Sequence, residues 1–414
     1  MRVAIVGGGP AGALLAWELA RAGAAATVFD ASHPREKPCG GGMTPAAWRM
    51  LPEAPAGDPL PARRVDACRF DSGAGPFVDV RLARPVLVAS RREVDAWLLR
   101  RAHERGARHR AERVVAVDAE GGVRTAGGER EAYDVVVGAD GAGSLVRRTL
   151  ASPVPAARLL IACGWLADGD APMLIRFTPG LAGYWWIFPR PGHVEVGICA
   201  PLGAVPTPEL LARLDAEAEA SFPTLAPPGR GRQAHTIPFP DADPRSLRGI
   251  AGPRWALVGD AAALADPVTG EGIRYALLSA RLLARTLLEG GGPERYARGV
   301  ADSFGRELVR AARWRPRFYA PGFTTRMVRY AARSEAVRRV LAELVLGEQG
   351  YRGLEWRLLR AAPRFLMDTA RERMRGRGAA GGRAVSEGIF PAPAVRPRRR
   401  GPSSGPSPAP RRGL

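Results

Sequence analysis

The sequence predicts an α/β fold in which a β-α-β domain carries an inserted antiparallel sheet and is followed by a helical C-terminal region. The chain opens with the apolar run 3–6, a glycine-rich turn and a helical segment, which is how a β-α-β unit begins. Between residues 156 and 239, short segments of alternating polarity are typical of antiparallel strands. Beyond residue 272 the apolar residues recur with helical periodicity.

The composition is that of a globular protein without a membrane span. The chain has 414 residues, enough for two domains, with 46% hydrophobic and 25% charged residues. No apolar run reaches the length of about 18 residues that a spanning helix needs. The apolar N-terminal stretch contains a glycine turn rather than a secretion signal, so we expect a cytoplasmic protein. None of the four cysteines lies in a C-x-x-C pair, so we expect neither a disulfide framework nor a metal site.

Almost half of the formal net charge of +20 lies in the C-terminal tail. Residues 371–414 hold eleven arginines and two glutamates in a stretch rich in Gly, Pro and Ser. We expect residues 375–414 to be disordered, because such a composition cannot bury a core. No nucleic-acid-binding motif is present, so nucleic acid is not an expected partner. An anionic membrane surface is the favoured partner for the excess charge.

The first chemical motif is the turn G-G-G-P-A-G at residues 7–12. Gly7 permits a tight turn, Gly9 lets the backbone approach a pyrophosphate, and Gly12 lets the helix pack closely on the strand. The pyrophosphate would then lie at the helix N-terminus, where free N–H groups and the helix dipole favour an anion. Asp30 ends the next strand, eighteen residues after Gly12, where a carboxylate accepts the hydroxyls of an adenosine ribose. This pattern indicates a Rossmann-like dinucleotide-binding domain.

Two further strand–turn–helix motifs follow. The first, G-A-D-G-A-G-S at residues 138–144, contains Asp140 and Gly141. The second begins at residue 257 and continues through D-P-V-T-G-E-G-I at residues 266–273. A carboxylate at a strand end can hold a polyol hydroxyl, and a glycine-flanked helix start offers N–H donors to an electron-rich ring edge. The candidate residues of this last motif are Gly259, Asp260, Pro267, Gly270, Gly272 and Ile273.

The remaining elements follow from periodicity and from the positions of Gly and Pro. Residues 133–138 are fully apolar, so this strand is expected at the centre of a parallel sheet. Other strands are predicted at 114–117, 159–166, 173–177, 184–188, 194–199 and 255–259. Helices are predicted at 92–105, 208–221 and 272–288, and further helices continue from there to about residue 375.

Taken together, the three motifs resemble the FAD-binding set of the para-hydroxybenzoate hydroxylase-like flavoproteins, over roughly residues 1–290. By that resemblance, the glycines of the first turn and Asp30 hold the adenosine diphosphate half of FAD. Asp260 holds the ribitol, and residues 270–273 lie against the isoalloxazine ring. Arg91 matches a family arginine near the cofactor.

The second fingerprint, the electron donor and the domain division complete the expectations from the sequence. Asp140-Gly141 matches the second fingerprint of the family. No further dinucleotide fingerprint is visible, so NAD(P)H binding transiently, or a ferredoxin-type carrier, is the expected reductant. The predicted division is a discontinuous FAD-binding domain at 1–155 and 245–290, a β-rich substrate domain at 156–244, C-terminal helices at 291–374 and the basic tail.

Two segments narrow the subclass. Residues 37–42, K-P-C-G-G-G, resemble the Lys-x-Cys-Gly-Gly signature of geranylgeranyl reductases, and Y-W-W-I-F-P at 184–189 resembles their Tyr-x-Trp-x-Phe-Pro signature. On a strand, Tyr184, Trp186 and Phe188 project from one face, forming an aromatic wall suited to a long apolar chain near the flavin. An ordinary hydrophobic core strand is the alternative interpretation.

Cys39 is the catalytic candidate. The resemblance implies reduction of isoprenoid carbon–carbon double bonds, in which a hydride from reduced flavin reaches one carbon and a proton the other. Cys39, or a water that it orders, is expected near the proton donor, and the alternative is a small residue in a tight loop. Members of the family act on geranylgeranyl groups of chlorophyll precursors, on archaeal-type ether lipids and on menaquinone side chains. The sequence does not choose among these prenyl substrates.

An FAD-dependent aromatic monooxygenase is the alternative enzyme, because it uses the same cofactor motifs. A flavin halogenase is disfavoured: it needs a lysine at a different place and a Trp-x-Trp-x-Ile-Pro segment, whereas Lys37 is the one lysine of the chain. A flavin-bearing protein without an activity has no specific motif in its favour.

The C-terminal helical segments interleave arginines with large apolar residues. Such a pattern fits an interfacial helix on anionic headgroups, peripheral to the inner face of the membrane, and it equally fits a helical cap with a solvated arginine face. The apolar residues concerned are Trp314, Phe318, Tyr319, Phe323, Trp356, Leu358, Leu359, Phe365 and Leu366.

We predict salt-sensitive association of the full-length protein with anionic membranes, since each arginine near such a surface adds about 1 kcal/mol of attraction. Flotation with liposomes measures it. The protein should float with anionic liposomes at low ionic strength, and not with neutral ones or at high salt. Protein that stays in the soluble fraction with anionic liposomes at low salt would contradict the prediction.

Overall fold

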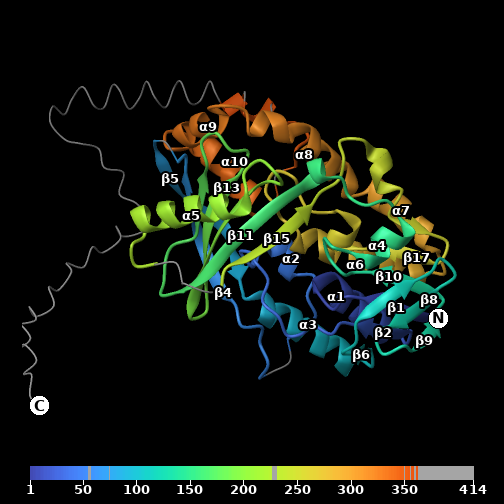
Figure 1. Cartoon of the computed structure of the whole chain (residues 1–414). Coiled ribbons are helices and arrows are strands. Elements are labelled where there is room, and N and C mark those ends of the chain that lie inside the picture. The colour runs from blue at the N-terminus through green and yellow to red at the C-terminus, as the bar shows by residue number, and fades with distance from the viewer. Residues whose placement is uncertain are drawn as a thin grey trace, which may run out of the picture.

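The computed structural model describes residues 1–361, apart from residues 55–56, 74, 226–230, 349, 355 and 359. The predicted tail at 375–414 and the end of the predicted helical region, residues 362–374, lie outside the described residues. Within the described part, no helix is long and apolar enough to cross a membrane. Two large sheets and a set of C-terminal helices make up the molecule (Figure 1).

A six-stranded sheet forms one half of the molecule, in the order β16-β17-β10-β1-β2-β6. As predicted, the apolar strand β10 is central: Val136 pairs with Ala4 of β1 on one side and Trp255 of β17 on the other, all in parallel. Its carboxyl end therefore lies beside those of β1 and β17. The strands are β1 (Arg2–Val6), β2 (Ala25–Phe29), β6 (Arg108–Arg110), β10 (Val135–Gly138), β16 (Ala251–Gly252) and β17 (Trp255–Leu257).

Helix α1 (Pro10–Arg21) is the packing centre of this half. Pro10 occupies the first helical turn, where its missing N–H would have had no partner. The helix packs against both α3 (Arg91–Glu104) and α6 (Ile273–Leu288), and Leu14 is fully buried. Burial therefore fixes the N-terminus of α1 at the carboxyl end of β1.

A small three-stranded sheet and a short helix complete this half. The strand predicted at 114–117 is present as β7, but it belongs to the small sheet rather than to the parallel one. Helix α4 packs on it. The elements are β7 (Val114–Val117), β8 (Gly122–Thr125), β9 (Arg130–Ala132) and α4 (Leu145–Leu150).

An eight-stranded sheet forms the second half, in the order β15-β11-β14-β13-β12-β4-β5-β3. Its neighbours are antiparallel except for the parallel pair β12–β4. Helix α5 (Thr207–Ser221) covers β11 and β14. The strands are β3 (Gly42–Met43), β4 (Arg63–Asp71), β5 (Phe77–Val88), β11 (Leu159–Asp168), β12 (Leu174–Phe177), β13 (Tyr184–Arg190), β14 (His193–Pro201) and β15 (Gln233–Pro238).

This sheet crosses the predicted domain boundary at residue 156. Strands β3, β4 and β5 come from before that boundary, yet they extend the sheet that residues 159–238 begin. The reason is edge pairing: β12 would otherwise expose its backbone groups, and Arg69 of β4 pairs opposite Leu174. Strands far apart in the sequence therefore share one sheet, and the division into domains stays a prediction.

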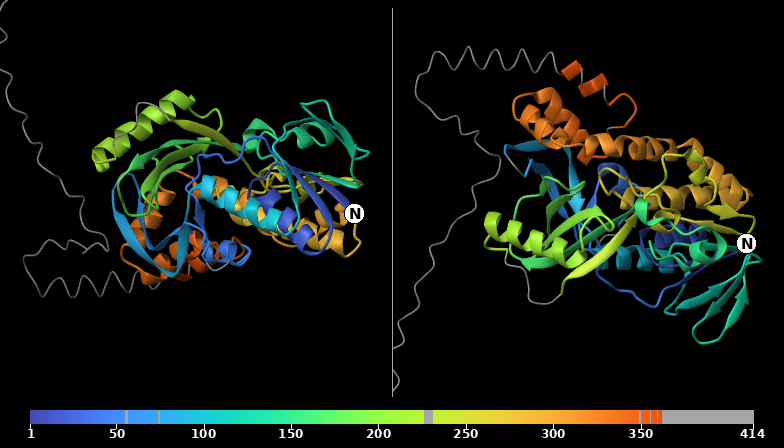
Figure 2. Two further views of the ribbon diagram at one scale, coloured as in Figure 1. Left: turned by 90° about the horizontal axis from the view of Figure 1, so that it is seen from below. Right: turned by 45° about the horizontal axis from the view of Figure 1, so that its top comes forward.

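The C-terminal helices run over the top of the molecule from the parallel sheet to β5 (Figures 1 and 2). They are α7 (Pro293–Asp302), α8 (Gly305–Phe318), α9 (Phe323–Ala331) and α10 (Glu335–Val345), and α9 and α10 pack on β5. Trp314 and Phe318 are buried, and the Phe318 ring lies 5.9 Å from that of Phe177 on β12. These two aromatic residues thus belong to a helical cap on the sheet, whereas Trp356 is 69% exposed.

We predict that Leu14→Ala lowers the free energy of unfolding by about 2–5 kcal/mol, because Leu14 is 0% exposed and its truncation leaves a cavity against α3 and α6. Leu288→Ala is the matched control: Leu288 is 42% exposed, so its loss should be about 0.5 kcal/mol or less. Denaturant unfolding followed by circular dichroism measures both. Equal losses in the two variants would contradict this packing.

Candidate functional site

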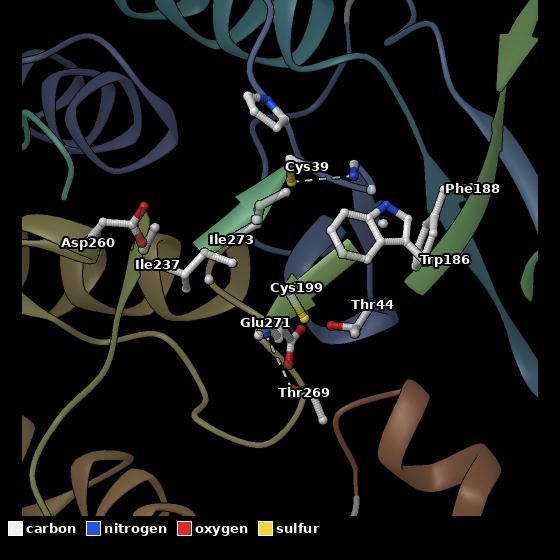
Figure 3. A pocket seen from close by; sticks show the side chains of 18 of the residues that line it. Cys39, Thr44, Trp186, Phe188, Cys199, Ile237, Asp260, Thr269, Glu271 and Ile273 are labelled. Atoms are coloured by element: carbon white, nitrogen blue, oxygen red, sulfur yellow. Dashed lines mark hydrogen bonds between the residues drawn. The ribbon is translucent and has the colours of Figure 1, made fainter. Parts of the chain in front are cut away.

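A cavity of about 250 Å³ lies where the two large sheets meet (Figure 3). Turns that follow β1, β10 and β17 form one side, and the strands of the eight-stranded sheet with α8 and α10 form the other. The predicted site residues that line it are Gly9, Cys39, Arg91, Gly141, Tyr184, Trp186, Phe188, Gly259, Asp260, Gly270, Gly272 and Ile273. The other predicted residues, Gly7, Gly12, Asp30, Asp140 and Pro267, do not line it.

The glycines of the first turn have distinct geometric roles. Gly7 has a φ of +106°, and a Cβ there would lie 2.4 Å from the carbonyl oxygen of Ala139. A Cβ on Gly12 would lie 1.9 Å from the carbonyl oxygen of Gly7. Gly9 is different, because a Cβ there would meet no described atom closer than 3.9 Å. Gly7 and Gly12 are thus needed for packing, while Gly9 keeps the space beside the start of α1 clear.

Asp30 lies at the end of β2, next to the same turn. Its carboxylate accepts hydrogen bonds from the N–H of Gly8, at 2.8 Å, and from Ser32, and the Nε2 of His33 lies 3.3 Å away. Burial alone would raise the pKa of Asp30, but the hydrogen bonds from His33, Ser32 and Gly8 outweigh it and hold the pKa well below its usual range. Asp30 therefore carries a charge at neutral pH.

Arg91 lies beside Gly9, at the start of α3. It is 6% exposed and forms a two-pronged ion pair with Asp95, at 2.9 and 2.7 Å. Its Nη2 is one of the two atoms nearest to the position that a Cβ on Gly9 would occupy, at 3.9 Å. A buried guanidinium beside a helix N-terminus makes this corner suitable for a pyrophosphate.

Asp140 acts on the protein itself. Its Oδ2 accepts the N–H of Leu145 at 2.7 Å and so caps the start of α4. Its Oδ1 is buried without a hydrogen-bond partner among the described residues. Burial raises the pKa of Asp140. One oxygen is therefore left over for a ligand or water, while Gly141 next to it lines the cavity.

Asp260 stands at the end of β17, in the short 3-10 turn η3 (Gly259–Ala262). Its Oδ2 accepts a hydrogen bond from the Nζ of Lys37 at 3.1 Å. Burial would raise the pKa of Asp260, but the charge and the hydrogen bond of Lys37 lower it. The pKa of His235 falls to about 3 because of burial and the Lys37 charge, so this imidazole is neutral. The sequence did not predict that Lys37 and His235 would reach the cavity.

The loop 266–271 is held from both sides. The Oδ1 of Asp266 accepts the N–H groups of Val268 at 2.8 Å and Thr269 at 2.9 Å, and the phenol of Tyr351 donates to it at 2.9 Å. Arg315 of α8 donates to the carbonyl of Pro267 at 2.9 Å. The C-terminal region thus fixes the loop that carries Gly270 and leads to Gly272, a role that no local pattern in the sequence indicated.

The aromatic wall lies where the strand pattern predicted it. Tyr184, Trp186 and Phe188 all line the cavity, with the Tyr184 and Trp186 ring centres 5.8 Å apart. The Tyr184 hydroxyl donates to the carbonyl of Thr269, which joins the wall to the loop. A Cβ on Gly42 would lie 2.7 Å from the Phe188 ring, so the glycine run of residues 40–42 packs flat on that ring. The two signature segments are therefore in direct contact.

Buried charges hold Cys39 against this wall. The Cys39 Sγ accepts the N–H of Gly41 at 3.4 Å (Figure 3). Arg190 donates to the Cys39 carbonyl. Arg190 is 1% exposed and lies 3.3 Å from Glu36. Glu195, also buried, accepts the indole N–H of Trp186. Neither Arg190 nor Glu195 could be predicted from the sequence, since nothing in their own segments marks them.

A second part of the cavity is apolar. Its side chains come from β4, β5 and β12 of the large sheet and from α8 and α10 of the cap. The apolar lining residues are Phe70, Val86, Met173, Ile175, Phe177, Phe318, Leu341, Leu344 and Val345. The cavity thus combines a polar part beside the glycine turns with an apolar part lined by the large sheet and the C-terminal helices.

Comparison with known proteins identifies the family. A family model described as an FAD binding domain matches residues 1–187. A menaquinone reductase of Mycobacterium tuberculosis is 32% identical over 341 residues, which cover 75% of this chain and 82% of the relative. A geranylgeranyl diphosphate reductase of Rhodobacter capsulatus is 28% identical over 313 residues, 69% of this chain and 74% of the relative. The chain belongs to the geranylgeranyl reductase family.

The fold is that of the family as well. A geranylgeranyl bacteriochlorophyll reductase-like protein from Thermoplasma acidophilum superposes with a TM-score of 0.70 at 19% identity, covering 83% of this chain and 95% of that one. A flavin-dependent brominase superposes with a TM-score of 0.67 at 19% identity, covering 90% and 99%. At such identities the likeness shows the fold alone.

The chain is therefore an FAD-dependent oxidoreductase of the geranylgeranyl reductase family, and FAD is its cofactor. The residues present fit that group. The open space at Gly9 beside Arg91 suits the pyrophosphate, and the charged Asp30 suits the adenosine ribose. Asp260 would hold the ribitol, and the backbone of Gly270 and Gly272 would face the ring. These individual roles remain predictions.

We predict that Gly9→Ala gives a folded protein that binds FAD at least about tenfold more weakly, a loss of about 1.4 kcal/mol. The new methyl group meets no described protein atom within 3.9 Å and occupies the space meant for the pyrophosphate. Flavin absorbance and circular dichroism of the purified protein measure binding and folding.

Two further glycines serve as comparisons for that variant. Gly249→Ala adds a methyl group with no described atom within 4 Å, far from the first turn in sequence, and should keep its FAD. Gly12→Ala should fail to fold, because its Cβ would lie 1.9 Å from a backbone oxygen. A folded Gly12→Ala protein with a full complement of FAD would contradict the N-terminal assignment.

Proposed function

We propose that this protein reduces carbon–carbon double bonds of an isoprenoid chain, the geranylgeranyl group of a lipid, a quinone or a pigment precursor. The observation that carries the proposal is the continuity of the cavity. Its polar end meets the loop with Gly270 and Gly272, and its apolar end runs past Trp186 toward α10. A long apolar chain bound there would bring one of its double bonds to the cofactor. The names of the relatives, menaquinone reductase and geranylgeranyl diphosphate reductase, support the same class of substrate.

The residues of the cavity would bind and orient the alkene and exclude water. Reduced FAD would supply a hydride equivalent to one alkene carbon. Trp186, Phe188 and Ile175 provide apolar surface on the large sheet, while Leu344 and Val345 close the cavity from α10. An isolated alkene accepts a hydride poorly, so the protein must also place a proton donor at the second carbon. We expect Cys39 in the neighbourhood of that donor.

The alternative, an FAD-dependent aromatic monooxygenase, has less support. Flavin-dependent brominase and monooxygenase structures share the fold at 19% identity, which does not transfer their chemistry. Lys37 does reach the cavity, but it is paired with Asp260 rather than free. The reductant, NAD(P)H or a ferredoxin-type carrier, and any contact with a membrane remain predictions.

We predict that the reduced enzyme adds two hydrogens to a prenyl substrate for each double bond and adds no oxygen. The apolar lining offers a phenol ring little to anchor it, whereas it matches a prenyl chain along its length. Dithionite-reduced protein, incubated anaerobically with geranylgeranyl diphosphate or with a menaquinone, provides the test by mass spectrometry of the products. A gain of one oxygen on a phenol under aerobic conditions, with no prenyl reduction, would contradict the proposal.

A further inference from the structure

One carboxyl group in the cavity has no role in the assignments above. Glu271 stands between Gly270 and Gly272, at the end of the loop 266–271, and its side chain lines the cavity (Figure 3). Its Oε1 is inaccessible to solvent and has no hydrogen-bond partner among the described residues, although the side chain as a whole is only half-buried. Its carboxyl group shares a hydrogen bond with the side chain of Thr44 at the start of α2 (Pro45–Trp48). Glu271 therefore has one buried oxygen, Oε1, that no described residue binds.

The surroundings of Glu271 keep a proton on it. Burial raises the pKa of Glu271 to about 7, and the charge of Asp266 also raises it. The charge of Arg274 and the hydrogen bond with Thr44 lower this pKa, but they do not cancel the effect of burial. Arg274 also donates to the carbonyl of Gly347, just after α10. Tyr275 is the other titratable group that interacts with Glu271, and burial raises its pKa well above 10, so it stays neutral. The carboxyl group is therefore substantially protonated near neutral pH.

The other titratable groups that line the described cavity are poorer proton donors. Asp260 is ionised and His235 is neutral, so neither holds a proton that it can release as an acid. The Tyr184 phenol already donates to a backbone carbonyl, and burial raises its pKa well above 10. The remaining groups, by type, are the cations Arg35, Lys37 and Arg91, the phenol of Tyr319, and the thiols of Cys199 and Cys39.

Burial or pairing disfavours most of those remaining groups as proton donors. Burial raises the pKa of the Cys199 thiol to about 11. Tyr319 donates its proton to the carbonyl of Val268 at 2.8 Å. Arginine does not release its proton in proteins, and the Lys37 ammonium is held by Asp260. Cys39 is thus the one rival to Glu271 in the described cavity.

We infer that Glu271 is the general acid of the alkene reduction, a catalytic residue that delivers the proton to the second alkene carbon. The inference rests on the proposed function. The proton leaves a carboxyl oxygen of Glu271 and forms the second C–H bond. The two electrons and the first hydrogen come from the reduced cofactor, so the alkene gains two hydrogens in all. The carboxylate that remains takes up a proton from solvent before the next turnover. Cys39 then shapes the cavity wall opposite the loop.

Glu271→Gln tests this, because glutamine keeps the shape of the side chain and cannot act as an acid. Single-turnover alkene reduction by the FAD-loaded, dithionite-reduced protein should slow about 10²–10⁴-fold. FAD content and prenyl-substrate binding should stay at the wild-type level, which a merely structural role would not predict. The matched control is Glu335→Gln, since that side chain is 78% exposed on α10. The control should reduce the alkene at the wild-type rate.

The pH dependence separates Glu271 from Cys39. Because an acid must be protonated to donate, the wild-type rate should fall as the pH rises through about 7, the pKa of Glu271. This decline should persist in Cys39→Ser and disappear from the residual rate of Glu271→Gln. A decline lost in Cys39→Ser and kept in Glu271→Gln would overturn the inference.

A measurement without turnover reads the proton directly. Infrared difference spectra of the purified protein between pH 6 and pH 8, on either side of about 7, should show a protonated-carboxyl band lost at the higher pH. The band should be present in Glu335→Gln and absent in Glu271→Gln. Its absence from the wild-type protein would mean that Glu271 is ionised and would overturn the inference.

The failure of this inference is distinguishable from the failure of the proposed function. If wild type and Glu335→Gln reduce prenyl chains and Glu271→Gln does so equally fast, the general-acid role is wrong and the reductase function stands. If neither wild type nor Glu335→Gln reduces any prenyl substrate, the proposed function is wrong, and the role assigned to Glu271 falls with it.

Discussion

The close approach of α1 to the ends of β1 and β10 is the constraint on which the site depends. Gly7 and Gly12 leave no room for a side chain, since an added Cβ would lie 2.4 Å and 1.9 Å from backbone oxygens. This contact sets the N-terminus of α1 beside the turn that follows β10. Because β17 continues the same parallel sheet, motifs at the start, about one third and about two-thirds of the way along the chain meet at one edge. A cofactor as long as FAD can then bind across all three.

The loop 266–271 depends on a different set of contacts, the hydrogen bonds to the buried carboxyl group of Asp266. Asp266 is 4% exposed and accepts three hydrogen bonds, two from its own loop and one from Tyr351. Burial raises the pKa of Asp266, while these three hydrogen bonds oppose that rise and tie the loop to the buried carboxyl group. The helical cap is therefore part of the site: it orients the loop and closes the apolar end of the cavity with Leu344 and Val345.

The side of the cavity that carries the aromatic wall is held together by a buried polar network. Arg190 and Glu195 leave water only because each finds partners: Glu36 and the Cys39 carbonyl for Arg190, and Trp186 for Glu195. These bonds attach the Cys39 loop to the aromatic strand β13. The glycines of that loop allow the contact, because any Cβ at Gly42 would overlap the Phe188 ring. The two sequence signatures are thus one structural unit.

The sequence by itself determined the local features of the protein. The glycine turns, the central apolar strand β10, the alternation that turns Tyr184, Trp186 and Phe188 to one face, and the main helices depend on residues within a few positions of one another, so they could be predicted with little error. The tertiary structure alone decided which distant segments meet. It placed β4 and β5 in the substrate-side sheet and paired Lys37 with Asp260. Burial and the charges around Glu271 likewise set its proton affinity, because both depend on residues that the chain brings together only when it folds.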